Sequence, residues 1–186
     1  IASLPPCVPG MRLNNKLVAT AKNERVDYVL GSKVTGCTVA DGKVVSVTVG
    51  TAGAGKEIKA DAVVLAGGGF ESGALKLDSH GHLHETILDL PVTMPEGVKE
   101  EDLIHGDYWG SPQPLFLCGV EVDETMLVTY QGKPVHSNVY AAGGVIAGAT
   151  RWQEKSGEGI ALGSAIKAAD AILSSVGAGA ATKERN

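Results

Sequence analysis

Apolar residues recur at helical spacing in two parts of this chain, one near its start and one near its end. The first part predicts a helix over about residues 11–24, on the pattern Met11, Leu13, Leu17, Val18 and Ala21. The second predicts a long alanine-rich helix that opens near residue 157. One face of it gathers Leu162, Ala165, Ile166, Ala169, Ile172 and Leu173, with Ser164, Lys167 and Ser174 opposite. We expect the apolar face to pack tightly, and residues 175–186 to form a flexible tail.

Between these helices the pattern changes to short apolar runs bounded by turn residues, which indicates strands. Lys33 to Ala40 and Lys43 to Gly50 flank Asp41-Gly42, the sequence favoured by a two-residue type I′ hairpin. Two further runs are continuously apolar, as in strands covered on both faces, and span residues 61–66 and 139–142. Weaker signals predict strands at 26–30, 56–60, 115–120 and 126–128, with a turn at 131–134.

The order of these elements suggests how the chain is organised. Residues 1–76 hold the first helix, the hairpin and a framework strand, and residues 116–174 hold the closing strands and the last helix. Residues 77–115 belong to a stretch without clean periodicity that carries four of the five histidines, so we interpret them as an irregular excursion between framework strands. Strands and helices in this arrangement place the chain in the α/β class.

Glycines follow both continuously apolar runs. The first run leads into Gly67-Gly68-Gly69-Phe70 and the second into Gly143-Gly144, while Gly157-Glu158-Gly159 opens the last helix after Ser156. In open α/β sheets, ligands sit beyond the carboxyl ends of strands, and glycine lets backbone approach a ligand closely. The first turn of a helix adds unpaired N–H donors. These segments predict one cofactor site contacted from two sides; the alternative is that the glycines only permit tight turns.

Composition narrows the classes of function. The net charge is −5 and the pI about 5.5, which argues against nucleic acid as a partner. Cys7, Cys37 and Cys118 form no CxxC pair, which argues against a disulfide framework and against most zinc or iron–sulfur sites. No uninterrupted apolar run approaches the ~20 residues of a membrane span. A reducing, cytoplasmic setting is the expectation.

The fingerprint of dinucleotide binding, GxGxxG after an N-terminal strand, does not occur in this sequence. The sequence also opens on Ile1 without an initiator methionine. We therefore interpret the chain as a fragment of a longer protein. Any dinucleotide phosphate site would then lie upstream of Ile1.

Several of these segments resemble a known family when they are taken in order. Residues 61–70 resemble the Ala-x-x-Val-x-Leu-Ala-Thr/Gly-Gly junction of the succinate dehydrogenase and fumarate reductase flavoprotein superfamily, and residues 138–173 resemble its closing segment. Within that superfamily the chain is most similar to the carboxyl-terminal half of the B subunits of anaerobic glycerol-3-phosphate dehydrogenases. Those subunits share patterns found here at residues 4–14, 70–75, 87–92, 106–114 and 119–125.

The resemblance implies the carboxyl-terminal part of a Rossmann-like FAD/NAD(P)-binding flavoprotein fold, with residues 77–115 as a cap-like segment on the substrate side. It implies FMN, or alternatively FAD, held at Gly67 to Phe70, Gly143, Gly144 and Ser156 to Gly159. It also implies oxidation of glycerol 3-phosphate to dihydroxyacetone phosphate, with electrons passed to quinone. A catalytic subunit and an iron–sulfur membrane-anchor subunit would be partners, holding the chain at the inner face of the cell membrane.

This sequence departs from the resemblance at the approach to the last helix. Residues 153–159 read Gln-Glu-Lys-Ser-Gly-Glu-Gly, where relatives often place Gly-Cys-Gly-Gly. The anionic Glu158 would weaken an argument based on the helix dipole, unless it turns to solvent. Without the upstream phosphate loop, we expect the fragment to bind flavin negligibly and to be inactive.

Three residues are candidates for catalysis. His105 is the first choice for a general base, because the ordinary pKa of histidine suits proton transfer near neutral pH. Arg151 would pair with an anion of the flavin or of the substrate. His84 lies in the alternating His80, His82 and His84, which on one strand face would resemble metal ligands. Phosphate recognition is the better reading for His84, and no metal site is predicted.

Two other functions remain open. The chain could be a non-catalytic scaffold or electron relay that docks its partner subunits, because it carries few catalytic side chains. It could instead belong to a flavoenzyme similar to fumarate reductase or ketosteroid dehydrogenase. Flavin content tests the first alternative, and turnover of glycerol 3-phosphate against fumarate tests the second.

Overall fold

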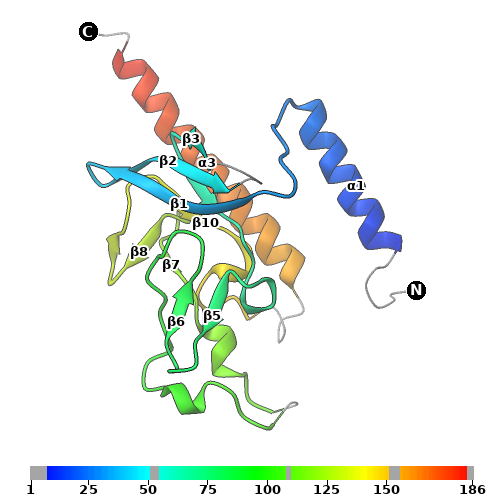
Figure 1. The fold of residues 1–186 in the computed structure, drawn as a ribbon, viewed down its shortest axis with the longest axis vertical. Helices are drawn as coiled ribbons and strands as arrows, with labels where there is room; N and C mark the ends of the chain where they lie inside the picture. The colour runs from blue at the N-terminus through cyan, green and yellow to red at the C-terminus, as the bar shows by residue number, and fades with distance from the viewer. Residues whose placement is uncertain (1–7, 51–54, 108–109, 151–155, 184–186) are drawn as a thin grey trace.

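The computed structural model describes residues 8–50, 55–107, 110–150 and 156–183, and describes side chains as far as residue 176. Figure 1 shows the sheets and a long C-terminal helix gathered together, with α1 (Val8–Asn23) standing to one side. The helix expected from the spacing of Met11 to Ala21 is confirmed and begins at Val8. None of its residues is buried.

The chain after α1 forms no strand, so the strand predicted at residues 26–30 is wrong. Val29 and Leu30 are 62% and 74% exposed, and no strand among the described residues pairs with this segment. An extended run becomes a strand only where a neighbour satisfies its backbone N–H and C=O groups. Apolar side chains alone do not supply that neighbour.

The hairpin expected around Asp41-Gly42 is confirmed. β1 (Lys33–Ala40) runs antiparallel to β2 (Lys43–Gly50), and β3 (Lys56–Lys59) adds a third antiparallel strand beside β2. Asp41 and Gly42 have φ of 51° and 71°, the left-handed values that a type I′ turn requires. Only β2 contributes fully buried side chains, from Val44 and Ser46.

The two continuously apolar runs form one parallel pair. β4 (Val63–Leu65) pairs with β10 (Val139–Ala141) in the register Val63 to Val139 and Leu65 to Ala141. All of β10 is buried, as expected for a strand covered on both faces. On β4 the expectation is only partly correct, because Val64 is 41% exposed.

The chain between β4 and β10 is mostly irregular, with short pieces of regular structure. In order they are η1 (Phe70–Ser72), β5 (Leu75–Leu77), β6 (Leu83–Glu85), η2 (Glu100–Asp102), η3 (Pro114–Leu117), β7 (Glu121–Val122), β8 (Val128–Tyr130) and β9 (Lys133–Pro134). β5 pairs with β6, and β8 lies between β7 and β9. Figure 1 shows the segment from β5 to η3 extending away from the hairpin sheet.

Two predicted strands in this region need correction. Residues 115–120 were expected to form a strand, but Pro114 opens a 3₁₀ turn instead, and extended pairing begins only at Gly119. Pro is favoured there because it needs no N–H partner in the first turn. The strand expected at 126–128 begins at Val128, because Met126 has a φ of 68° and closes a turn by donating to Asp123 O at 3.0 Å.

Asn138 joins the hairpin sheet to the parallel pair. Its Oδ1 accepts from Val44 N at 2.9 Å, and its Nδ2 donates to Val44 O at 2.8 Å and to Asp61 O at 2.9 Å. The core beneath consists of Val44, Leu65, Leu75, Leu90, Val120, Val128, Val139, Ala141 and Val145. These contacts fix the amino ends of β4 and β10, and the glycines follow at the opposite, carboxyl ends of the two strands.

α3 (Gly157–Lys183) is confirmed, but it packs on the face opposite to the expected one. Ser164 and Ala168 are 8% and 0% exposed, whereas Leu162 and Leu173 are 65% and 70% exposed. The contact with β10 and η4 (Gly143–Val145) is made by small side chains, which let the backbones approach closely. The helix also continues to Lys183, through much of the stretch expected to be a tail.

By length and composition, α3 qualifies as long enough and apolar enough to cross a membrane over Gly157–Val176. The sequence analysis expected no uninterrupted apolar run of this length, and it did not foresee a helix that qualifies on its mean hydropathy. The stretch qualifies on its average, because it contains Glu158, Lys167 and Asp170 and so has no uninterrupted apolar run. Core helices of soluble proteins meet the same criterion, so it does not establish a span.

Candidate functional site

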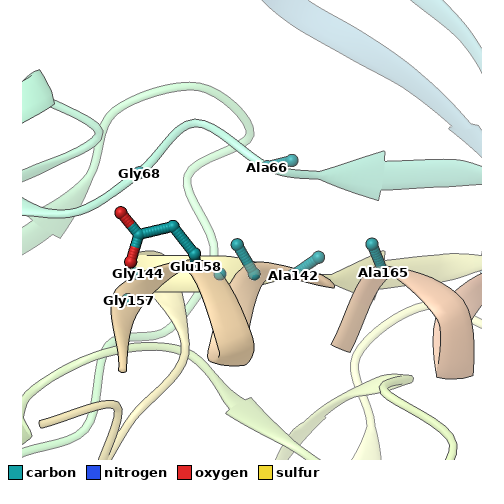
Figure 2. A pocket seen from close by; sticks show the side chains of 9 residues that line it. Ala66, Gly68, Ala142, Gly144, Gly157, Glu158 and Ala165 are labelled. Carbon is teal, nitrogen blue, oxygen red and sulfur yellow. The ribbon is translucent and has the colours of Figure 1, made fainter. Parts of the chain in front are cut away.

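The two glycine-bearing strand ends and the start of α3 enclose one cavity of about 440 Å³. Figure 2 shows the segment after β4 passing over the first turns of α3, with the end of β10 beside them. The lining residues are Ala66, Gly68, Ala142, Gly143, Gly144, Gly157, Glu158, Ala161 and Ala165. Five of the predicted site residues, Gly68, Gly143, Gly144, Gly157 and Glu158, thus meet around one space of the size that small-molecule sites have.

Close packing in the loop after β4 explains why Gly67 and Gly68 are glycines. A Cβ atom at Gly67 would lie 2.6 Å from Ile87 Cδ1, and one at Gly68 would lie 2.4 Å from Ser72 Oγ. Gly68 also has a φ of +82°. The hydroxyl of Ser72 lies 2.6 Å from Gly67 O and 2.9 Å from Gly69 O, to which it donates. The loop is therefore fixed in shape, and it presents backbone instead of side chains to the cavity.

The next residue of this loop, Phe70, has a structural contact. It begins η1 and packs, partly buried, against the hydrophobic core. Neither Phe70 nor Gly67 nor Gly69 is among the cavity-lining residues. Their predicted contact with a cofactor remains a prediction.

Ser164 holds α3 against the loop after β10. Its Oγ accepts from Gly143 N at 2.9 Å and lies 2.6 Å from Ile160 O, to which it donates. Gly143 has a φ of +76°, which favours glycine. Sequence reasoning placed Ser164 on the outer face; the signal it missed is the spacing of four between Ser164 and Ala168, two small residues on one helical stripe.

Glu158 is the charged residue of this cavity. Figure 2 shows its carboxylate projecting from the first turn of α3 towards the Gly68 segment. It makes no hydrogen bond or ion pair with the residues that the structure describes. The first helical turn around it carries N–H groups without intrahelical acceptors and a partial positive charge. The cavity thus combines backbone donors with one acceptor that bears a full negative charge.

The remaining predicted residues near α3 are less informative. Ser156 precedes the helix and is partly buried, and the Cβ position at Gly159 faces open space. Neither lines the cavity. Arg151 lies in residues 151–155, outside the described part of the chain, so its predicted pairing with an anion remains a prediction.

His84 belongs to a cluster around Asp78 on the β5–β6 hairpin, not to the cavity. Asp78 Oδ1 accepts from the backbone N–H groups of His80 at 2.8 Å and His82 at 2.9 Å, while Oδ2 lies 3.1 Å from His84 Nε2. The hydrogen bond to His84, followed by that to the backbone of His82, holds the pKa of Asp78 well below its ordinary value. Among the described residues, no group of three ligating side chains is arranged to hold a metal.

Asp78 should make the hairpin sensitive to acid. Because its pKa is lower in the folded chain than in the unfolded chain, its carboxylate stabilises the fold above the unfolded value of about 3.9, and this contribution falls as pH drops further. We expect Asp78→Asn to be less stable than wild type at pH 5, and we expect the difference between their free energies of unfolding to become smaller as the pH is lowered to 2. Urea unfolding measures both free energies. A difference that stays constant over this range would contradict the assignment.

His105 is tied to Gln113 in the segment before η3. Gln113 Nε2 lies 3.1 Å from His105 Nδ1, and Gln113 Oε1 accepts from His105 N at 2.8 Å, which fixes the orientation of the amide. Nδ1 therefore accepts, and the ring proton sits on Nε2, 3.4 Å from Pro112 O. Both ring nitrogens are therefore engaged within this segment. It does not line the cavity.

Sequence reasoning missed Glu85, which is almost fully buried. Its Oε1 accepts from Ile87 N at 2.7 Å, and its Oε2 accepts from Leu88 N at 2.8 Å and Leu90 N at 3.3 Å. The carboxylate thus accepts hydrogen bonds from backbone N–H groups that would bond to carbonyl oxygens in a regular helix or sheet. Cys118 is also buried, and burial raises its pKa to about 11, which leaves its thiol unreactive near neutral pH.

Comparison with known proteins identifies a matching family and several relatives. The sequence model of the FAD binding domain family matches residues 1–160. The B subunit of anaerobic glycerol-3-phosphate dehydrogenase from Actinobacillus pleuropneumoniae serotype 5b is 29% identical over 181 residues, covering 92% of this chain and 40% of the relative. The corresponding subunit from Yersinia pestis is 29% identical over 175 residues, with 94% and 40% covered.

A third relative, the B subunit of the same enzyme from Haemophilus influenzae, is 28% identical over 177 residues, covering 93% of this chain and 40% of the relative. The chain thus spans about two fifths of the length of these relatives. No solved structure matches it significantly.

Proposed function

Because this chain belongs to the FAD-binding domain family, we propose that the cavity between β4, β10 and α3 receives the ring end of FAD. The observation that carries the proposal is the meeting of two strand ends and a helix start, lined almost wholly by glycine and alanine. The family model names FAD, so we prefer FAD to FMN, which the sequence analysis put first.

The lining suits a flat group held by backbone. Ala66, Gly68 and Gly144 present no side chain larger than a methyl group, so a planar ring can approach their peptide groups closely. The first turn of α3 offers N–H donors to a ring oxygen or nitrogen. Ser164 keeps this turn in place by its hydrogen bond to Gly143 N.

The phosphates of FAD require other residues. Among the described residues that line the cavity, Glu158 is the one charged side chain, and it is an anion. The sequence also lacks GxGxxG. We therefore propose that the pyrophosphate is bound by a part of the protein corresponding to the portion of the relatives that this chain does not match, and that this chain alone binds FAD weakly and is inactive.

The reaction we propose follows the names of the relatives, which are subunits of anaerobic glycerol-3-phosphate dehydrogenases. When bound, FAD would accept the hydride from the carbinol carbon of glycerol 3-phosphate while the hydroxyl proton leaves to a base, which gives dihydroxyacetone phosphate, and the electrons would pass on towards quinone. Further subunits, among them an iron–sulfur membrane anchor, would receive these electrons and hold the complex at the inner face of the membrane. His84 and Arg151 remain candidates for phosphate recognition, and His105 for proton transfer.

Filling the cavity from α3 tests this function. We expect Ala165→Leu, in protein that also contains the portion found in the relatives, to lower FAD affinity at least about tenfold, because the larger side chain occupies the ring position. Ala169→Leu is the matched control, since Ala169 lies one turn further along the same helix and does not line the cavity. FAD content is read from absorbance and from titration of the apoprotein.

Two results would overturn the proposal: wild-type protein that takes up no flavin on reconstitution, or equal FAD affinities for the two variants. Turnover of glycerol 3-phosphate against fumarate, with an artificial electron acceptor, then separates the proposed substrate from that of fumarate reductase-like enzymes.

A further inference from the structure

Glu158 places a negative charge in the cavity that we propose for the ring of FAD. It occupies the first turn of α3, whose N–H groups and dipole would by themselves favour negative charge on a ligand. A full carboxylate charge outweighs the roughly half charge of the helix terminus. Taken together, the described residues at this end of the cavity therefore carry a net negative charge.

No residue that the structure describes neutralises this charge. Among the described residues, no Lys or Arg lines the cavity, and Glu158 makes no ion pair with any of them. Figure 2 shows the carboxylate directed into the gap between α3 and the Gly68 segment. A ligand in that gap meets an acceptor for its own N–H or O–H donors, together with a repulsive field for any negative charge that it acquires.

We propose that Glu158 sets the redox preference of this cavity by favouring the neutral, oxidised ring of FAD over its negatively charged reduced form; this rests on the proposed function. The oxidised ring is neutral, and the uptake of two electrons and one proton gives it a negative charge. A carboxylate that lines the same cavity raises the free energy of the charged form only. Glu158 thereby lowers the reduction potential and makes the bound FAD pass its electrons on more readily.

The test compares Glu158→Gln with wild type in the FAD-loaded protein that contains the portion found in the relatives. Xanthine and xanthine oxidase supply electrons, and a reference dye reports the potential while absorbance reports the oxidised and reduced FAD. At the potential where wild-type FAD is half reduced, we expect the ratio of reduced to oxidised FAD in Glu158→Gln to be about tenfold higher.

Two matched variants separate charge from shape. Glu158→Asp keeps the charge and removes one methylene group, so its ratio should stay within about threefold of wild type. Asp170→Asn removes the same charge from the same helix, roughly 18 Å further along at 1.5 Å per residue, where salt screens it, and should leave the ratio unchanged.

The outcomes distinguish the two proposals. Wild-type protein without FAD overturns the proposed function. FAD-loaded Glu158→Gln with an unchanged ratio, or an equal shift in Glu158→Asp, overturns the role of the Glu158 charge and leaves FAD binding intact. If Glu158→Gln does not retain FAD, the affinities of its apoprotein for oxidised and for reduced FAD give the same ratio by linkage.

Discussion

Replacing Gly119 by alanine should lower the free energy of unfolding by about 3 kcal/mol or more. A Cβ atom there would lie 2.5 Å from Ala147 N, 2.6 Å from Ile146 C and 2.6 Å from Val145 O. All three are backbone atoms, so no side-chain rotation relieves the overlap. The two segments would have to move apart, although Val120 N donates to Val145 O at 2.8 Å and Ala147 N to Val120 O at 3.0 Å.

The damage should also reach the cavity. Val145 ends η4, the turn that begins at Gly143, so a shift of this segment displaces one wall of the site. Urea unfolding measures the stability, and FAD titration of the protein that contains the portion found in the relatives measures the site. We expect both to fall together.

Gly36→Ala is the matched control for this substitution. Gly36 also lies in a paired strand, opposite Thr48, but a Cβ there meets no atom within 4 Å and its φ is ordinary. Its stability should change by less than about 1 kcal/mol. Similar losses for the two variants would show that the contacts at Gly119 are not the cause.

The helices and strands that were predicted correctly are those whose conformation depends on residues close to them in sequence. The hairpin follows from Asp41-Gly42, because only a few residue pairs tolerate two consecutive left-handed conformations. β4 and β10 follow from unbroken apolar runs, and the start of α3 follows from Gly157 and the alanine-rich stretch behind it. In each case the deciding chemistry lies within about ten residues of the element.

The failures share a different cause. Val26 to Leu30 has the composition of a strand but gains no partner among the described residues, and α3 buries Ser164 and Ala168 instead of its larger apolar side chains. Both outcomes depend on what lies beside the segment in space. A single sequence states which side chains are apolar, but not which surface a distant segment will cover.

The candidate site divides in the same way. Gly68, Gly143 and Gly157 were predictable, because bare backbone at the end of a strand or the start of a helix is a local property. The candidate histidines were not predicted from a local backbone pattern, and His84 and His105 lie in the segments around Asp78 and Gln113, away from the cavity. Their partners within the fold could not be inferred from spacing.

Asn138→Ala should cost about 3 kcal/mol or more of stability, the second large effect that we expect. The substitution leaves Val44 N without its acceptor, and Val44 O and Asp61 O without their shared donor, all at the junction of two sheets. These partners lie 94 and 77 residues away in sequence, which is why no local pattern predicted them. Asn15→Ala, on the exposed face of α1, is the control and should change stability by less than about 0.5 kcal/mol.

The position of Asn138 connects this loss to function. β10 begins at the next residue and ends at Ala141, and Ala142 to Gly144 line the cavity directly after it. We therefore expect Asn138→Ala to weaken FAD binding even where the protein remains folded, while hydrogen exchange rises at both β2 and β10. Faster exchange at β2 alone, with FAD affinity unchanged, would show that the hairpin sheet and the cavity are held independently, contrary to the role assigned here to Asn138.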